Sequence, residues 1–325
     1  MKNIAIIGAG MTGLSLAYNL QEHNITIFDK SWRPGGRVST RKHDNYLFDH
    51  GAHYLSTNHS VNQLNDVISR YNLGQIIEID FATDYLKNKK TRKKIIIGQN
   101  GINSIPKSIF DNIKVNNYLN SKIIKISKNS NDLFSLFSEK QVFKDFEYVL
   151  ICIPYLQSKE LSKDFIDFTQ IVNEPSYDPI HTVMLSYKNI NNIDVKAGLN
   201  LHKDISFFMN QNIKFNELSH DCWVLNMSSE YTNRNIDIDS FTIEKYAQSI
   251  FQNEFNIKNE ISFIKSHKWL YAQTKISYNN ISKKNWINSK DNKIFLTGDW
   301  VLGKSLSDAW DAGEKLSHYI KILSV

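Results

Sequence analysis

The feature that most constrains this chain is a glycine pattern that follows an apolar run near its start. The run from Ile4 to Ile7 contains no turn-forming residue, as is typical of a strand buried on both faces of a parallel sheet. Gly8, Gly10 and Gly13 follow at GxGxxG spacing, and residues 12–23 have the apolar spacing of a helix. Such glycines allow a tight turn, close approach of a phosphate, and close packing of helix on strand. The pattern predicts a βαβ unit with a dinucleotide site.

A second apolar strand, Ile25 to Phe28, ends in Asp29, where a carboxylate can accept hydrogen bonds from a ribose diol. The glycine pattern alone could serve packing, but strand, helix and terminal acid together favour dinucleotide binding. The N-terminus of the helix adds N–H donors and partial positive charge for the phosphates. These residues do not distinguish an NAD site from an FAD site.

Length and composition indicate two domains around a substantial apolar core. The chain has 325 residues, of which 41% are hydrophobic and 12% aromatic, and this length exceeds a typical single domain. Cys152 and Cys222 lie far apart and suggest neither a disulfide framework nor a metal knuckle, which fits a reducing cytoplasm. There is no signal-type cleavage site and no apolar run long enough to cross a membrane. We therefore expect a cytoplasmic protein without a membrane partner.

The net charge of +6 raises the question of a nucleic-acid partner. Lysine is spread along the whole chain and no nucleic-acid-binding motif is present, so we expect no such partner. The one dense basic cluster consists of Lys87, Lys89, Lys90, Arg92, Lys93 and Lys94. It is either a solvated hairpin tip or a surface that attracts an anionic, phosphate-bearing substrate.

Later segments are expected to return to the first sheet. The apolar segments 123–126 and 134–137 predict a hairpin, and the nearly continuous apolar run from Phe146 to Ile153 predicts one further strand. A buried strand at 294–297, then Gly298-Asp299, then a helix from about Leu306 predict the last return. Ser305 and Asp308 have the spacing of a capping box at the start of this helix.

These patterns predict an α/β fold: a Rossmann-type nucleotide-binding domain with a second, mixed-sheet α+β substrate domain. We expect the first domain to be discontinuous and to contain residues 1–55, 101–154 and 290–325. Residues 56–100 and 155–289 are expected to form the substrate domain, in which strands such as 182–187 alternate with helices such as 238–255.

Several further motifs carry a family resemblance. The chain resembles, nearly end to end, the bacterial renalase-like branch of the FAD-dependent amine-oxidase superfamily. The matching segments are Gly8–Gly13, Phe28-Asp29-Lys30, Gly35-Gly36-Arg37, Asp49–Tyr54, Gly101–Ser104, His267–Ala272 and Gly298-Asp299-Trp300. The last two are the most specific to the branch. The resemblance implies a two-domain fold like that of p-hydroxybenzoate hydroxylase, and FAD held non-covalently.

The resemblance also assigns residues to the cofactor. Gly36 and Arg37 would cover the diphosphate and ribityl chain, Ile123 would face adenine, and Asp299 would accept from the ribityl hydroxyls. The helix N-terminus at Leu306 would point at flavin N1 and C2=O, where negative charge accumulates on reduction. The full expected set is Gly8, Gly10, Met11, Gly13, Asp29, Lys30, Gly36, Arg37, Gly51, Ala52, His53, Ile123, Gly298, Asp299, Ser305 and Leu306.

Members of the branch oxidise off-isomer dihydronicotinamides, 2- and 6-dihydroNAD(P), to NAD(P)+ by hydride transfer to flavin N5, and pass the electrons to molecular oxygen to form hydrogen peroxide. Such a substrate becomes aromatic on losing hydride, so the site need only hold it about 3–3.5 Å from N5 and exclude water. We therefore expect no catalytic side chain and no metal. Ser305 stands where relatives commonly carry arginine, which leaves Lys304 as the substitute anchor. The expected substrate-facing residues are Tyr54, Gln99, Ile180, Trp300 and Lys304.

Three other functions fit parts of the sequence. A flavin amine oxidase or desaturase acting on a small amine or apolar substrate could use Trp300 and Tyr271 as an aromatic pair, but no lysine bridged to N5 is identifiable. An NAD-dependent dehydrogenase would leave Gly35-Gly36-Arg37 and Gly298-Asp299 unexplained. A basic nucleic-acid-binding module would show steep salt dependence but has no supporting motif.

Overall fold

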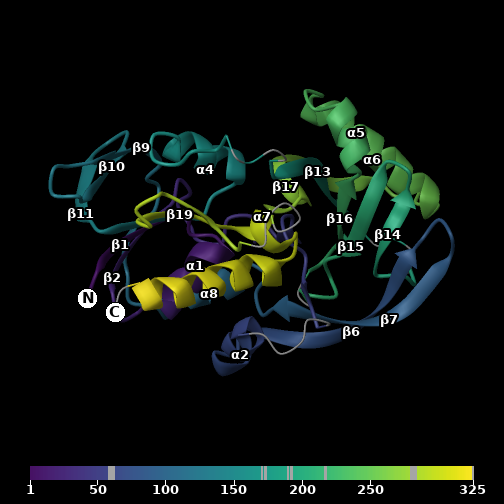
Figure 1. Cartoon of the computed structure of the whole chain (residues 1–325). Coiled ribbons are helices and arrows are strands. Elements are labelled where there is room, and N and C mark those ends of the chain that lie inside the picture. Colours follow the sequence, from purple (N-terminus) through teal and green to yellow (C-terminus); the bar gives the residue numbers. More distant parts are fainter. Residues whose placement is uncertain are drawn as a thin grey trace.

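The computed structural model describes residues 1–57, 63–169, 171, 174–188, 190, 193–215, 218–278 and 284–323. Figure 1 shows two lobes, with both chain ends in the same lobe. The strands are β1 (Asn3–Ile7), β2 (Asn24–Phe28), β3 (Thr40–His43), β4 (Tyr46–Asp49), β5 (Leu55–Ser56), β6 (Gly74–Asp84), β7 (Lys89–Gly98), β8 (Asn116–Tyr118), β9 (Ile123–Lys128), β10 (Phe134–Ser138), β11 (Val142–Phe146), β12 (Tyr148–Ile151), β13 (Ser176–Tyr187), β14 (Ala197–His202), β15 (Ile205–Asn210), β16 (Asp221–Met227), β17 (Ile261–Ile276), β18 (Ile287–Asn288) and β19 (Ile294–Leu296). The helices are α1 (Met11–Asn19), α2 (Gln63–Arg70), α3 (Ser104–Asp111), α4 (Tyr155–Ser162), α5 (Ser229–Arg234), α6 (Ser240–Glu254), α7 (Asp299–Leu302) and α8 (Leu306–Leu323).

The first lobe is built on a six-stranded sheet with the order β18-β19-β12-β1-β2-β8. Its strands are parallel except for β18. Side chains of β1 alternate between two cores: Ile4 and Ile6 face a helical layer, whereas Ala5 and Ile7 face the small sheet β9–β11 and α4. The predicted Rossmann-type α/β fold is confirmed.

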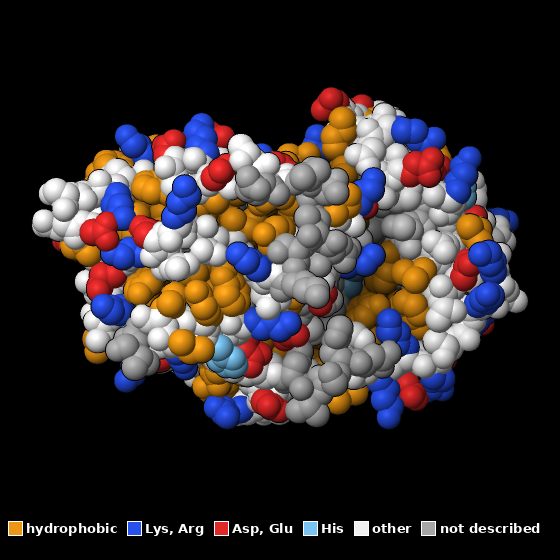
Figure 2. Space-filling model, viewed as in Figure 1, with side chains coloured by type: hydrophobic (Ala, Val, Ile, Leu, Met, Phe, Trp, Pro, Cys, Tyr) orange, Lys and Arg blue, Asp and Glu red, His pale blue; other side chains and the backbone are white. Residues whose placement is uncertain are grey.

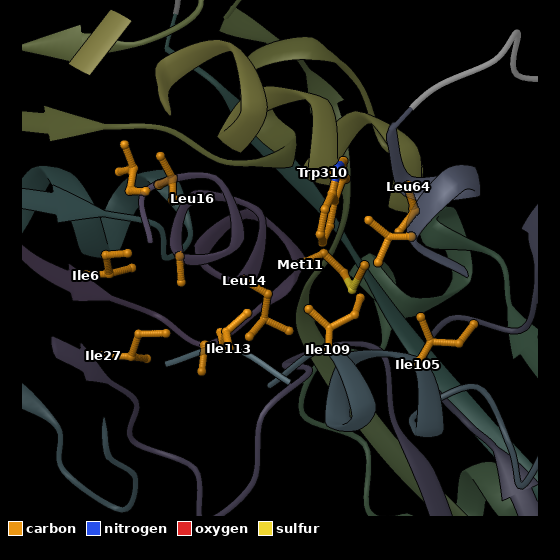
Figure 3. Close-up of a cluster of buried hydrophobic side chains, with 14 of the residues drawn as sticks. Ile6, Met11, Leu14, Leu16, Ile27, Leu64, Ile105, Ile109, Ile113 and Trp310 are labelled. Carbon is orange, nitrogen blue, oxygen red and sulfur yellow. The ribbon is translucent and has the colours of Figure 1, made fainter. Parts of the chain in front are cut away.

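The helical layer places two helix N-termini side by side. In Figure 3, Met11 and Leu14 of α1 lie near Trp310 of α8 and Ile109 of α3. A Cβ on Gly313 would lie 2.4 Å from the carbonyl oxygen of Thr12, so α1 and α8 pack with almost no gap. No described helix, α8 included, is long and apolar enough to cross a membrane.

The second lobe is built on an eight-stranded mixed sheet with the order β17-β13-β16-β15-β14-β6-β7-β5. Its outer face packs against α5 and α6, around the fully buried side chains of Trp223 and Phe251. Its inner face is turned toward the first lobe, because Met184 and Val224 pack there against Phe48 of β4. We refer to this surface below as the inner face.

The packing differs from the sequence-based prediction in two respects. The strand predicted from Phe146 to Ile153 is confirmed in the six-stranded sheet as β12, Tyr148–Ile151, but its first residue is not part of it: β11 ends at Phe146, in a different sheet. The break lies at Glu147, whose carboxylate accepts hydrogen bonds from Lys2 Nζ and the backbone N–H of Asn3, both at 3.0 Å. In addition, α2, α4 and β18 pack with the six-stranded sheet and its layers, although the predicted boundaries put them in the substrate domain.

Candidate flavin site

The glycine loop after β1 has the form that a diphosphate requires. Gly8 has φ of +111°, which favours glycine. A Cβ on Gly13 would lie 1.9 Å from the carbonyl oxygen of Gly8, so this position cannot hold a side chain. By contrast, nothing lies within 4 Å of where a Cβ on Gly10 would be. The loop is therefore closely packed at Gly8 and Gly13 and open at Gly10, where a phosphate would approach.

A second glycine turn lies over the first. Gly36 has φ of +57° and a Cβ there would be 3.6 Å from Gly10 Cα. The N–H of Gly35 donates to the carbonyl oxygen of Ala9 at 2.8 Å. Asp29 joins this arrangement, because its two carboxylate oxygens accept from the N–H groups of Ala9 and Ser31, each at 2.7 Å. Burial raises the pKa of Asp29.

Arg37 and Asp299 form an ion pair between this loop and the start of α7. Arg37 Nη2 lies 2.6 Å from Asp299 Oδ1, and Nη1 donates to the carbonyl oxygens of Tyr271 and Ala272 in β17 at 3.0 Å. Thr274 Oγ1 donates to the other carboxylate oxygen of Asp299 at 3.1 Å. Arg37 and Asp299, each of which was expected to contact the cofactor, are thus in direct contact with each other, and both are hydrogen-bonded to β17.

The N-terminus of α8 opens beside that of α1. Thr12 Oγ1 donates to the carbonyl oxygen of Ala309 at 2.7 Å. The predicted capping box is present: the N–H of Asp308 donates to Ser305 Oγ at 3.0 Å, and Asp308 Oδ2 accepts from the N–H and hydroxyl of Ser305 at 2.8 and 2.7 Å. The side chain of Ser305 therefore caps the helix. Leu306 begins the helix, and Lys304 is exposed in front of it.

The segment Gly51–His53 lies against the second glycine turn. A Cβ on Gly51 would lie 1.9 Å from the carbonyl oxygen of Arg37, and that oxygen accepts from the N–H of Ala52 at 2.9 Å. This close backbone approach explains the small residues at positions 51 and 52. The segment then leads directly to His53 on the inner face.

His53 is held as a neutral ring. Its Nδ1 lies 2.9 Å from the carbonyl oxygen of Asp49, so Nδ1 carries the proton, and Nε2 accepts from Asn226 Nδ2 at 2.9 Å. The ring stacks on Phe207 at 4.4 Å. Burial, assisted by the charge of Lys214, lowers the pKa of His53 to about 3. Both ring nitrogens are hydrogen-bonded within the protein. His53 is therefore held in one position, and neither nitrogen is free to act as a general base.

Sequence reasoning missed a buried ion pair beneath this histidine. Lys214 Nζ lies 2.9 Å from Asp49 Oδ2 and donates to the carbonyl oxygen of His53 at 2.6 Å. The exposed fraction is 0% for the Lys214 side chain and 1% for that of Asp49. The other oxygen of Asp49 accepts from Thr40 Oγ1 and the N–H of Ile102. Lys214 lies in a polar turn after β15 and follows no motif that would have singled it out.

The five expected substrate-facing residues lie in different environments. Tyr54 and Ile180 lie in the second lobe, where Tyr54 packs near Phe207 and Ile180 is buried opposite Trp269. Gln99 is exposed and donates to the carbonyl oxygen of Asn72 at 2.7 Å. Trp300 has no exposed surface and packs between Tyr155 and Tyr278, so it supports the site from behind. Lys304 is exposed.

Two further expected cofactor residues, Ile123 and Lys30, lie near the end of β2. Ile123, at the start of β9, is buried in the cluster that contains Phe28, close to the end of β2. Lys30 follows Asp29 and is exposed. Met11 contributes its side chain to the helical core, as Figure 3 shows, so only its backbone at the start of α1 remains for a ligand.

Pairing between neighbouring strands brings residues from distant segments together on the inner face. Phe207, Asn226, Thr182 and His267 lie directly opposite one another on β15, β16, β13 and β17. Trp269, two residues further along β17, donates from Nε1 to the carbonyl oxygen of His50 at 2.9 Å. Figure 2 shows a hollow between the lobes, near β14 and β15 of Figure 1, with an apolar floor and Lys and Arg side chains at its rim.

A separate hollow of about 590 Å³ lies at the opposite edge of the six-stranded sheet. Asn3, Asn24 and Asn116, at the beginnings of β1, β2 and β8, contribute to its lining. Nucleotides bind at the carboxyl ends of parallel strands, where the glycine loops lie. This hollow is therefore not the cofactor site.

Comparisons with known proteins agree with this geometry. Residues 6–71 match the family of NAD(P)-binding Rossmann-like domains. Coproporphyrinogen III oxidase of Staphylococcus aureus is 46% identical over 54 residues, which is 15% of this chain and 12% of that protein. L-amino-acid oxidase of Sistrurus catenatus edwardsii is 32% identical over 110 residues, 32% of this chain and 21% of that protein. The chain therefore matches only a small part of the length of these relatives.

Solved structures share the fold over nearly the whole chain. A protein of Exiguobacterium sp. 255-15, provisionally named a protoporphyrinogen oxidase, has a TM-score of 0.79 at 12% identity, with 99% of both chains covered. Putrescine oxidase bound to putrescine has a TM-score of 0.74 at 10% identity, also with 99% of both chains covered. At such low identity the likeness establishes a common fold.

Proposed function

We propose that this protein is an FAD-dependent oxidoreductase that holds FAD non-covalently and oxidises a small molecule. The observation that carries the proposal is the meeting of three chain segments: the loop open at Gly10, the turn at Gly36 above it, and the Arg37–Asp299 pair beside the start of α8. An NAD site alone would require only the first of these. The proteins of similar fold and partial sequence include several oxidases and a desaturase.

The residues present fit FAD. The N–H groups at the start of α1 would receive the diphosphate, because no described side chain caps this helix and no acidic residue stands in its first turn. Asp29 would accept from the adenosine ribose, and Arg37 and Asp299 would contact the ribityl and diphosphate region. The N-terminus of α8 would face the pyrimidine edge of the ring and stabilise negative charge there.

We further propose that the substrate is an off-isomer dihydronicotinamide, 2- or 6-dihydroNAD(P), oxidised to NAD(P)+. FAD, when bound, would supply the hydride acceptor, and molecular oxygen would receive the electrons and form hydrogen peroxide. The protein side chains bind and orient: His53 is neutral with both ring nitrogens bonded, and Lys214 is bonded to Asp49. A substrate that needs no proton removed from it suits walls of this kind.

A second candidate is a flavin amine oxidase or desaturase, which the likeness to putrescine oxidase and L-amino-acid oxidase favours. Its expected aromatic pair is not supported by the packing, because Trp300 is fully buried. Lys214 is buried beside this site, but its ammonium is bonded to Asp49 and to the carbonyl of His53, which does not favour it as the lysine bridged to N5.

The absorption spectrum of the purified protein tests the cofactor. We expect a yellow protein that releases FAD on heating or acid treatment; a colourless protein that does not take up FAD would contradict the proposal. Anaerobic mixing with 6-dihydroNAD, 2-dihydroNAD, putrescine and L-amino acids, each alone, tests the substrate. We expect rapid bleaching of flavin only with a dihydronicotinamide, and peroxide once air is admitted. Bleaching by amines alone would establish the second candidate.

A further inference from the structure

The pairing of β6 with β7 divides the basic cluster between two faces. Glu78 pairs with Lys94, Ile79 with Lys93, and Asp80 with Arg92. Successive side chains of a strand point to opposite faces, so Arg92 and Lys94 share the outer face with Glu78 and Asp80. Arg92 forms ion pairs there with Glu78 at 3.0 Å and Asp80 at 3.7 Å. Lys93 alone of these three lies on the inner face.

Lys93 points into an aromatic setting on that face. Its Nζ donates to Tyr54 Oη at 2.9 Å and lies 4.4 Å from the ring centroid of Phe81 and 4.8 Å from that of Tyr54. The Tyr54 ring is 6.4 Å from the ring of Phe207, on which His53 stacks. The chain of contacts Lys93–Tyr54–Phe207–His53 therefore runs along the inner face to the segment assigned to the flavin.

The ammonium of Lys93 has no carboxylate within ion-pair distance among the residues that the structure describes. It is half-buried and held by one hydrogen bond and two ring faces. An ammonium has three donors, so N–H groups remain available. Tyr54 Oη accepts from Lys93, which leaves the phenolic proton free to be donated. Two donors, one of them charged, thus stand together on the inner face.

We infer that Lys93 and Tyr54 together recognise an anionic group of the substrate, either a carboxylate or a phosphate. This inference rests on the proposed function in placing the substrate on the inner face. It names the substrate class, since a partly desolvated lysine attracts an anion and repels an ammonium. A nucleotide or an amino acid has the required anion, whereas a diamine such as putrescine has none.

Binding of matched probe pairs tests the inference without any turnover. Nicotinamide mononucleotide and nicotinamide riboside differ in one phosphate, and nicotinate and nicotinamide differ in one carboxylate. Titration calorimetry on the FAD-loaded protein should show that Lys93→Met weakens binding of the anionic member of one pair roughly tenfold or more, the range of a charge-assisted hydrogen bond. Binding of the member that lacks the phosphate or carboxylate should not weaken. The pair that responds identifies whether the anion is a phosphate or a carboxylate.

Two further variants make the result specific. Tyr54→Phe, which removes only the hydroxyl, should also weaken binding of the same anionic probe. Lys94→Met, on the outer face of the same strand, should leave all four affinities unchanged. Equal losses for an anionic probe and its matched partner, unchanged binding of both anionic probes to Lys93→Met, or no binding of either anionic probe to the parent protein would overturn the inference. If charge discrimination is found but dihydronicotinamides fail to reduce the flavin, the proposed function fails and the anion site stands.

Discussion

Arg37 and Asp299 lie 2.6 Å apart, although one follows β2 and the other stands at the beginning of α7. Arg37 also donates to two carbonyl oxygens of β17. The contact therefore joins the loop after β2 and the start of α7, both in the first lobe, to the eight-stranded sheet of the second lobe. The pair thus stabilises the relative position of the three segments on which the candidate flavin site depends.

A double-mutant cycle should measure this contact. Arg37→Met should lower the free energy of unfolding by about 3–5 kcal/mol, because it leaves the Asp299 carboxylate, only 9% exposed, without its partner. Asp299→Asn should cost less, about 1.5–3 kcal/mol, because the Arg37 side chain is 33% exposed and water can solvate it. The double variant should lose less than the sum, with a coupling of about 1–3 kcal/mol. Urea unfolding of the FAD-free proteins gives these values. Strict additivity would mean that the two side chains do not interact in solution.

The glycine loop offers a test that separates cofactor binding from folding. Gly10→Ala should leave the melting temperature of the FAD-free protein nearly unchanged, since space is open there, and should weaken FAD binding about tenfold or more. Gly13→Ala should itself destabilise the protein by about 1–3 kcal/mol or more, since its Cβ would meet the Gly8 carbonyl. Thermal melts and FAD titrations check both. Normal FAD affinity in Gly10→Ala would place the diphosphate elsewhere.

The buried pair of Lys214 and Asp49 should be far more important for stability than an exposed pair. Lys214→Met leaves a buried carboxylate uncompensated and should cost about 3–5 kcal/mol of unfolding free energy. Lys163→Met breaks the exposed pair with Glu160 at 2.6 Å and should cost far less, because water already screens that pair. Denaturant unfolding of both variants makes the comparison, and equal costs would contradict the burial of Lys214.

The variant Asp49→Asn should show a distinctive pH dependence. Burial lowers the pKa of Lys214, and Asp49 is the group that opposes this shift. Without Asp49 the folded-state pKa falls further below the unfolded value of about 10.4. The unfolded state then binds the extra proton, so stability should rise from pH 7 toward pH 10 as folded Lys214 becomes neutral. A deficit that is constant over this range would show that Lys214 stays charged.

Acid should destabilise the protein through two buried histidines. Burial lowers the pKa of His50 and of His53 from 6.5 to about 3. Between these values the unfolded state binds protons that the folded state does not, so the free energy of unfolding is highest above pH 6.5 and falls as pH drops toward 3. His53→Phe keeps a ring against Phe207 but removes one titrating group. Its slope should be shallower by at most about 1.4 kcal/mol per pH unit; an unchanged slope would refute the assignment.

The sequence determined the features that depend on residues close together in the chain. The turn at Gly8, the close packing at Gly13, the acid at the end of β2 and the capping box of Ser305 and Asp308 all depend on local spacing, and each was predictable. The same local view failed at Glu147, because the groups that break the strand there, Lys2 and Asn3, lie 145 and 144 residues away in the sequence, at the start of the chain.

Only the tertiary structure decided which side chains from distant segments meet. The residues around Arg37 and Asp299 were recognisable as motifs, but their contact depends on how β17 packs against both of them. Lys214 carries no local signal, and its partner Asp49 is selected by the packing of the turn after β15 against β4. Lys93 differs from its basic neighbours only through the register of β6 and β7, since one residue of shift would turn its ammonium to the outer face.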